Sequence, residues 1–172
     1  KADSYHGVFP HWLNGATGKT IPFSRKDDGA DLVESSFLFQ GLLTAKQYFN
    51  ANNAVEQELR NKITWLWDEV EWDWFTKGGE EVLYWHWSPN NGWAMNFPLR
   101  GYNECLITYV LAASSTTHTI TKDVYDNGWA RNGAFKNGNT YYTYPLPLGE
   151  NMGGPLFLAH YSFMGINPNG LS

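Results

Sequence analysis

The sequence predicts an all-α fold in which an inner layer of buried helices is wrapped by an outer layer of surface helices. Segments that are apolar around their whole circumference alternate with amphipathic segments, in the order buried, surface, buried, surface, buried. Only 17% of the 172 residues are charged, against about 25% in an average domain, while 42% are hydrophobic. Periodicity alone leaves one alternative open, an irregular helical bundle.

The first two helical segments show the alternation most clearly. Residues 31–49 are apolar nearly all round, which is typical of a helix buried on every side. Residues 54–72 place apolar side chains at three- and four-residue steps, with charged residues on the far side. That spacing predicts an amphipathic surface helix built on Val55, Leu59, Ile63, Leu66 and Val70.

The remaining helical segments continue the pattern. Residues 103–113 are mostly apolar and predict a second buried helix. Residues 120–129 predict a shorter amphipathic helix with Lys122, Asp123 and Asp126 outward. Residues 155–166 return to the buried type, and Pro155 suits the first turn of a helix.

Long aromatic loops separate these helices. Within residues 82–96, two β-prone runs flank the sequence Pro-Asn-Asn-Gly, which predicts a β-hairpin. Residues 131–152 are rich in Gly and Tyr and predict a long loop, and residues 5–23 have the same character. Loops of this length without helical signals are usually functional.

Charge and composition exclude several classes of partner. The net charge is −5 and the basic residues are scattered, which argues against nucleic acid. No apolar run approaches the ~20 residues of a membrane span, so no membrane partner is predicted. The single cysteine, Cys105, excludes an internal disulfide and a thiolate metal cluster. The chain starts at Lys1 with neither an initiator Met nor a signal peptide, so we expect a processed or partial chain.

Acidic residues cluster where a loop enters the first buried helix. Asp28 is predicted to cap this helix, with Asp31 at its third position, and capping alone would explain both. Asp31 and Glu34 are three residues apart and share a helix face. Because the rest of the helix carries almost no charge, Glu34 is expected to be paired or to face a cavity.

Glu104 begins the second buried helix. A carboxylate entering an apolar helix is expected to have a raised pKa, as a general acid requires, although an acid at a helix start is also favourable without catalysis. In a ring of alternating helices the N-terminal ends of all inner helices point to the same rim. The sequence therefore predicts that Asp27, Asp31, Glu34 and Glu104 meet in one mouth.

Such a mouth suits a sugar substrate. Aromatic rings stack on pyranose rings, and hydrolysis of a glycosidic bond needs one carboxylic acid and a second carboxylate. The loop aromatics available for stacking are Trp12, Trp85, Trp87, Trp93 and Tyr141. A second group of tryptophans lies around the end of the amphipathic helix and is predicted to pack: Trp65, Trp67, Trp72 and Trp74.

The histidines give little support for a metal site. None of the five has an HExxH or paired spacing, so no metal is predicted. His86 and His160 are candidates for binding substrate at the mouth, with core packing as the alternative. No serine-nucleophile motif, phosphate loop or dinucleotide fingerprint is present, so no cofactor is predicted.

Several long blocks of the sequence resemble one family. The chain is similar over nearly its whole length to the bacterial glycoamylase-like family, which includes the endo-β-1,2-glucanases of glycoside hydrolase family 144. The resemblance implies an (α/α)6 toroid, metal-independent and inverting cleavage of β-1,2-linked glucan, and a periplasmic or secreted location. The blocks are YHGVFPHWLNG, TGKTIPF, DDGADLVESSFLFQGLLTAKQYF, VEWDWFT, YWHWSPNNGWAMN, GYNECLITYVLAASSTTH and GGPLFLAHYSFMG.

The resemblance also assigns residues. The family's acid falls on Glu104, beside Asn103 as a substrate-binding candidate, and its acidic cluster falls on Asp27, Asp31 and Glu34 as water-activating base or subsite residues. Family members are far longer, and a complete toroid has twelve helices against five segments here. We therefore expect residues 1–172 to be one partial catalytic domain, about half of the toroid, with the remainder of the domain as a possible partner.

The sequence thus predicts a glycoside hydrolase acting on β-glucan, β-1,2-linked and attacked in endo fashion. Two alternatives stay open. The first is a glucan transglycosylase, which would rearrange chains without net hydrolysis. The second is a non-catalytic carbohydrate-binding module, whose carboxylates would only bind hydroxyl groups.

Overall fold

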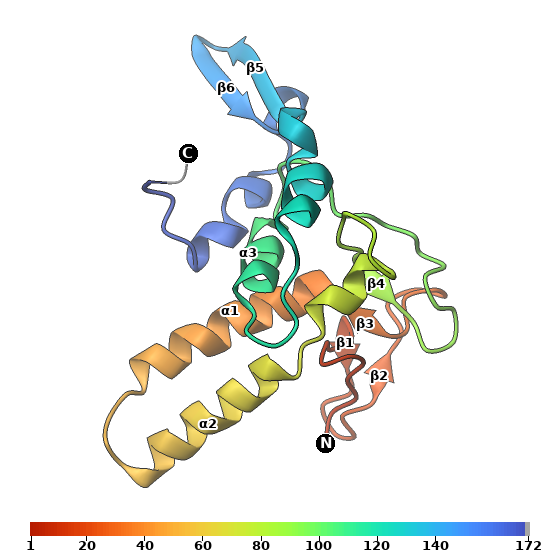
Figure 1. Ribbon diagram of the computed structural model, residues 1–172, viewed down its shortest axis with the longest axis vertical. Coiled ribbons are helices and arrows are strands. Elements are labelled where there is room, and N and C mark those ends of the chain that lie inside the picture. Colours follow the sequence, from red (N-terminus) through yellow and green to blue (C-terminus); the bar gives the residue numbers. More distant parts are fainter. Residues whose placement is uncertain (171–172) are drawn as a thin grey trace.

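Three α-helices organise the computed structural model, which describes residues 1–170. They are α1 (Leu32–Tyr48), α2 (Ala54–Asp68) and α3 (Leu106–Ser114). Helices α1 and α2 run antiparallel as a long pair, and α3 packs on the other side of α1 (Figure 1). Helices are the main regular structure, which confirms the helical class predicted from the sequence.

Both long helices begin at side-chain caps. Asp31 caps α1, where its carboxylate accepts a hydrogen bond from the backbone N–H of Glu34. Asn53 caps α2 in the same way, and the carboxylate of Glu56 reaches back to the Asn53 side chain. These caps satisfy backbone donors that would otherwise have no partner in the first turn.

The core lies where the three helices meet the 3₁₀ helix Trp72–Thr76. Its largest side chains are aromatic, and Phe39, Trp67 and Trp72 pack against one another with ring centroids 5.6–6.4 Å apart. Tyr109 of α3 and Trp129 form a second buried pair at 5.4 Å. Aromatic packing of this kind accounts for part of the high aromatic content.

Two further segments are helical as the sequence predicts. Helix α2 is amphipathic, with Ile63 and Trp67 buried, although Val55 and Leu59 at its N-terminal end are exposed. Val70 is buried beyond the end of the helix. Residues 124–129 form a short π-helix within the predicted segment 120–129.

The prediction that α1 is buried on all sides is wrong within the described residues. Most residues of its N-terminal half are buried, but Leu38 is 44% exposed, and Tyr48 at its C-terminal end is 78% exposed. The apolar surface of α1 is therefore wider than the surface that α2 and α3 cover.

The prediction of one buried helix at residues 155–166 is also wrong. Two single-turn 3₁₀ helices, Leu156–Ala159 and Tyr161–Met164, replace it, with His160 at the break. Leu156 and Met164 are exposed, and Ser162 is the buried residue of this segment. A short helix depends on packing for its stability, and little packs on this segment among residues 1–170.

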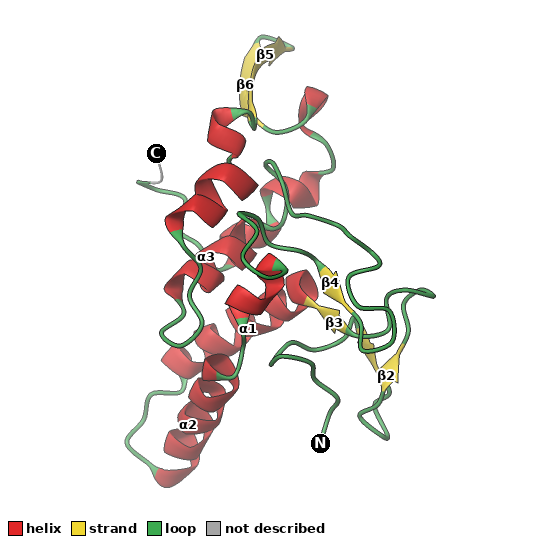
Figure 2. Cartoon of the chain, turned by 45° about the vertical axis from the view of Figure 1, so that its right-hand side comes forward, coloured by secondary structure: helices red, strands yellow, loops and turns green. Residues whose placement is uncertain are grey.

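Three antiparallel strand pairs complete the fold (Figure 2). Strand β1 (Trp12–Leu13) pairs with β2 (Thr20–Ile21), and β3 (Ala30–Asp31) pairs with β4 (His86–Trp87). The segment 82–96 does fold back, with bridges at Ser88–Gly92 and Tyr84–Pro98, but its regular strand pairs with β3 rather than within a hairpin. That register places His86 opposite Asp31.

The predicted loop at residues 131–152 contains a hairpin, which corrects the sequence prediction. Strand β5 (Lys136–Tyr141) pairs with β6 (Tyr144–Leu148), at the end of the molecule remote from β1–β4 (Figure 1). The two turn residues, Tyr142 and Thr143, have φ values of 49° and 74°, the left-handed region that a tight hairpin turn requires. Two prolines in β6 and a turn without Gly or Asn hide this hairpin from the sequence patterns.

Among the described residues, no helix has the length and apolar character that a membrane crossing requires.

We expect Gly128→Ala to destabilise the fold by about 1–3 kcal/mol, since overpacking against rigid atoms has that cost. A Cβ at this position would lie 2.6 Å from the backbone oxygen of Glu81 and 2.8 Å from the Cα of Val82. Gly41→Ala is the matched control: it lies in α1 with no atom within 4 Å and should stabilise by about 0.5–1 kcal/mol. Urea unfolding of both variants measures the difference, and equal stabilities would contradict the close packing at Gly128.

Candidate active site

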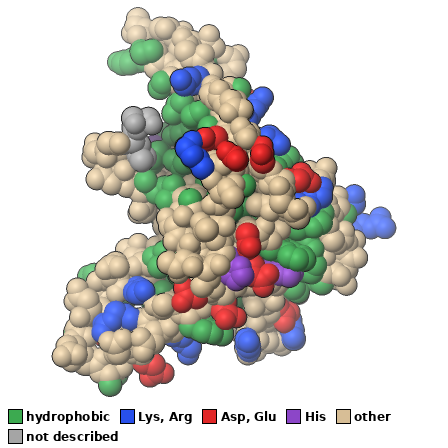
Figure 3. Space-filling model, viewed as in Figure 1, with side chains coloured by type: hydrophobic (Ala, Val, Ile, Leu, Met, Phe, Trp, Pro, Cys, Tyr) green, Lys and Arg blue, Asp and Glu red, His purple; other side chains and the backbone are tan. Residues whose placement is uncertain are grey.

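Acidic and histidine side chains gather near the middle of one face of the molecule (Figure 3). The site is built where β3 passes directly into α1, so that Asp31 is both the last residue of β3 and the cap of α1. Strand β4 lies beside β3 and supplies His86, while His11 comes from the chain just before β1. Residues far apart in the sequence therefore meet at one helix start.

Asp31 is the centre of this cluster and is fully buried. One carboxylate oxygen accepts hydrogen bonds from the backbone N–H of Glu34 at 3.0 Å and from the Trp85 indole at 2.8 Å. The other lies 2.8 Å from Nδ1 of His11 and 3.7 Å from Nε2 of His86. Burial by itself raises the pKa of Asp31, but the interactions with His86, with the Glu34 N–H and with His11 lower it overall.

His86 joins Asp31 to Asp27. Its Nε2 is 3.2 Å from the Asp27 carboxylate, and Asp27 itself is only 3% exposed. Burial tends to lower the pKa of His86, but the two carboxylates outweigh it and raise the pKa to about 9. At neutral pH His86 is therefore an imidazolium held between two acids.

Glu34 differs from both aspartates. It is exposed, and among the described residues no hydrogen bond or ion pair engages its carboxylate. It faces an open hollow of about 390 Å³ that His11, Phe9 and Leu38 also line. Partial burial, followed by the charges of Asp31 and Glu104, raises its pKa. Of the two expectations for Glu34, a charged partner or a cavity, the structure shows the second.

Glu104 lies at the same corner. It sits in the turn just before α3, not within the helix, and is partly exposed. Its backbone oxygen accepts a hydrogen bond from Ser162 at 2.8 Å, which fixes this turn. Its charge acts on Glu34 and on the neighbouring buried Cys105, whose pKa is raised by burial and by these acids.

The structure thus brings together the acids that the sequence groups in one mouth. Asp31, Glu34 and Glu104 interact electrostatically, and Asp27 is joined to them through His86. Sequence reasoning missed His11, which contacts Asp31, because no spacing links two residues that are brought together only by folding.

Asp28 has a different role from the predicted helix cap. Its carboxylate accepts hydrogen bonds from Ser88, Asn90 and Asn91, the residues of the turn that follows β4. Asp31, three residues later, takes the capping role instead. Asp28 therefore fixes the position of β4, and with it His86.

The aromatic candidates divide into two groups. Trp12 is 49% exposed, next to His11, and Trp85 bonds to Asp31, so both lie at the acids. The structure does not bring the others there. Trp87 and Trp93 lie in a separate aromatic cluster, Tyr141 lies on the remote β5–β6 hairpin, and His160 is exposed with no described contact to the acids. Asn103 bonds to the backbone of Cys105, beside Glu104.

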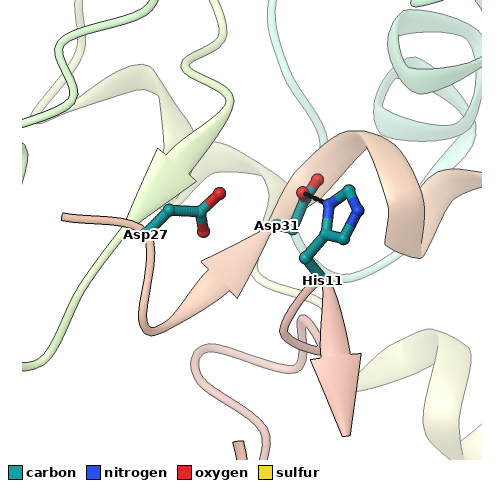
Figure 4. A group of neighbouring side chains, drawn as sticks. All are labelled: His11, Asp27 and Asp31. Atoms are coloured by element: carbon teal, nitrogen blue, oxygen red, sulfur yellow. Dashed lines mark hydrogen bonds and ion pairs between the residues drawn. The ribbon is translucent and has the colours of Figure 1, made fainter. Parts of the chain in front are cut away.

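One trio offers donor atoms of the type that binds metal ions. Atoms of His11, Asp27 and Asp31 lie within 4.8 Å of one another (Figure 4). The imidazolium of His86 already stands between the two carboxylates and balances their charge. A metal ion would have to displace it, so this donor set does not fit a resident metal, and the absence of a metal stays a prediction.

The sequence matches a family model and a known protein. Residues 96–172 match the Glycoamylase family model, described as "Putative glucoamylase". The chain is also 45% identical, over 98% of its length, to an exo β-1,2-glucooligosaccharide sophorohydrolase (non-reducing end) of Parabacteroides distasonis, of which it covers 26%.

Solved structures agree with these sequence matches. The chain is similar to an endo-β-1,2-glucanase of Chitinophaga pinensis in complex with sophorotriose and glucose, with TM-score 0.95, 53% identity, and coverage of 99% of this chain and 41% of that one. A Bacteroides uniformis protein that is also described as a "putative glucoamylase" has a TM-score of 0.95 and 58% identity. The match covers 98% of this chain and 41% of that one. The chain therefore spans less than half the length of these relatives, and its resemblance to glycoamylase-like proteins is confirmed.

We expect the stability of the protein to fall as the pH rises from 6 to 8.5. His86 has a folded-state pKa of about 9, above the 6.5 of an unperturbed histidine, so its contribution is complete below pH 6.5 and is lost as the pH approaches 9. The loss is on the order of 2 kcal/mol over this range. Urea unfolding at several pH values measures it.

His86→Gln is the control for this pH dependence, because glutamine fills a similar space without titrating. The variant should be less stable at pH 6 and should lose the slope between pH 6 and 8.5. The same slope in both proteins would show that His86 does not hold its proton in the folded state.

Proposed function

We propose, from the confirmed resemblance, that this chain forms part of the catalytic domain of a glycoside hydrolase that cleaves β-1,2-glucan. One observation carries the proposal: nearly the whole chain superposes on an endo-β-1,2-glucanase that holds sophorotriose. The carboxylate cluster of this chain, with exposed aromatic rings at its edge, is of the kind that glycoside hydrolysis requires.

The proposed architecture is an (α/α)6 toroid of which residues 1–172 form about half. Helices α1 and α3 would belong to its inner layer and α2 to its outer layer. The exposed apolar surface of α1, at Leu38 and Tyr48, supports this arrangement because the remaining wall of such a toroid would cover it. That wall is the proposed partner of this chain.

Glu104 is the proposed general acid, which protonates the departing glycosidic oxygen. The resemblance implies that the family's acid corresponds to this position, and the partly exposed side chain of Glu104 beside the acid cluster supports contact with substrate. In an inverting reaction the second carboxylate activates a water molecule on the opposite face of the sugar, about 6.5–9.5 Å away.

Glu34 is the proposed water-activating base. A carboxylate with a raised pKa is the stronger base, and Glu34 has both the raised pKa and an open hollow in front of it. Asp31 suits this role less because its oxygens are engaged by Trp85, His11 and His86. Asp27 is engaged by His86, so both aspartates are better placed to hold the site in shape.

Trp12 and Trp85 are the proposed sugar-stacking residues at the cluster. Trp12 presents half of its surface to solvent, with Phe23 at 5.0 Å, and Trp85 lies against Asp31. Endo action is proposed for this chain, with exo action as the second candidate, because the two relatives whose names specify β-1,2-linked substrates include one of each kind. The periplasmic or secreted location stays a prediction.

We expect the full natural chain to release reducing ends from β-1,2-glucan and not from β-1,3-, β-1,4- or α-1,4-glucan. NMR during the first turnovers should show the inverted α-anomer, because the proposed mechanism uses a single displacement by water. Chromatographic sizing separates the alternatives: mixed oligosaccharides indicate endo action, and a uniform short product indicates exo action. Redistribution of chain lengths without new reducing ends would indicate a transglycosylase and overturn hydrolysis.

Glu104→Gln and Glu34→Gln should each reduce kcat by about 10²–10⁴-fold with little change in substrate affinity, since each removes one proton-transfer group. Glu58→Gln, an exposed change on α2, is the matched control and should leave kcat unchanged. Steady-state kinetics on β-1,2-glucan and direct binding measurements test this. Full turnover by either site variant would reject the role proposed for that residue.

A further inference from the structure

A second hollow, of about 600 Å³, lies outside the acid cluster. Two indole rings, Trp74 and Trp93, form its wall, with centroids 6.4 Å apart and planes inclined by 32°. Trp74 is 39% exposed, although it belongs to the tryptophans predicted to pack. Trp67 and Trp72 of that group do pack in the core. Trp65 is 49% exposed, so the packing prediction is wrong for both Trp65 and Trp74.

The backbone of β4 separates this hollow from the acids. Successive side chains of a strand point to opposite faces, so His86 faces Asp27 and Asp31 while Trp87 faces the other way. Trp87 packs edge-on against Trp74, with centroids 6.1 Å apart. The hollow therefore lies on one face of β4, and the acid cluster lies on the other.

The charged groups that line the hollow are already paired. Nδ1 of His118 lies 3.0 Å from the Asp73 carboxylate, and Nδ1 of His6 lies 2.8 Å from that of Glu71. The ammonium group of Lys77 donates to Asn96 at 2.8 Å. A charged ligand would have to compete with these pairs, whereas a neutral ligand rich in hydroxyl groups can share their free lone pairs and N–H groups.

The floor of the hollow is open backbone. Gly78 and Gly79 have φ values of 88° and 101°, and a side chain added at either would meet no atom within 4 Å. The space above them is therefore free for a ligand. A wall of aromatic rings with a few polar groups placed around it is the usual composition of a small-molecule site.

We propose that this hollow is a second, non-catalytic binding site for a glucan chain, in which Trp74 and Trp93 stack on pyranose rings. The neutral polar rim would bind sugar hydroxyls. The identity of the ligand as a glucan rests on the proposed function, whereas the existence of a sugar site on this side of β4 rests on the hollow itself. Such a site would hold a polymer on the protein at a point away from the reacting bond.

Tryptophan oxidation measured by mass spectrometry tests the proposal site by site. The full natural chain carries Glu104→Gln to prevent turnover, and β-1,2-glucooligosaccharides serve as the probe. We expect the probe to slow oxidation of Trp74 and Trp93 several-fold. Trp12 reports on the acid cluster, and Trp65, 49% exposed on α2, is the control that should not respond.

A variant adds a second measurement. Trp74→Ala should weaken binding at the hollow about tenfold, the effect of roughly 1.4 kcal/mol. Protection of Trp93 should then need about tenfold more probe, while protection of Trp12 should need no more than before. Trp65→Ala is the matched control and should shift neither titration.

The outcomes separate this proposal from the proposed function. Protection of Trp12 without protection of Trp74 and Trp93 overturns the second site and leaves the glucanase proposal intact. A Trp74 that is unreactive without any probe shows a covered hollow and also overturns the second site. Protection of none of the three, with no hydrolysis of any glucan by the unsubstituted chain, overturns both.

Discussion

The buried carboxylate of Asp31 is the interaction on which the rest of the site depends. It caps α1, accepts a hydrogen bond from the Trp85 indole, and lies within hydrogen-bond distance of His11, so three separate segments converge on one side chain. A buried carboxylate is stable only when its oxygens are satisfied in this way. The contacts of Asp31 also set the positions of two other residues. Glu34 lies in the first turn of the helix that Asp31 caps, and His86 lies opposite Asp31 on β4.

Four carboxylates in one corner take on different properties because their surroundings differ. Asp31 and Asp27 are buried and share the positive charge of His86, which compensates for their burial. Glu34 is more accessible, lies near two like charges, and has a raised pKa. The aspartates therefore shape the corner, and this difference is the reason that the proposed catalytic roles fall on the two glutamates.

Periodicity and local chemistry predict the parts of the fold that depend on neighbouring residues in the chain. Helices α1, α2 and α3 follow from apolar spacing, and the meeting of Glu34 with Glu104 follows from their places at helix starts. The β3–β4 pairing joins residues more than fifty positions apart, so no local pattern reveals that His86 faces Asp31. The prediction of a helix at residues 155–166 is wrong for a related reason. An apolar pattern forms a stable helix only where other elements pack against it.

Strand β4 fixes the positions of both the acid cluster and the aromatic hollow. Its register places His86 on the side of the acids and Trp87 on the side of Trp74, and the turn held by Asp28 fixes that register. A slip of one residue would exchange the two side chains, leaving an indole against two buried carboxylates. Asp27 would then lose its ion pair, Asp31 would keep only the pair with His11, and a buried carboxylate left without a partner costs several kcal/mol. The ion pairs of His86 therefore also determine the side of β4 on which Trp87 meets Trp74. The acid cluster and the aromatic hollow both depend on the pairing of β3 with β4.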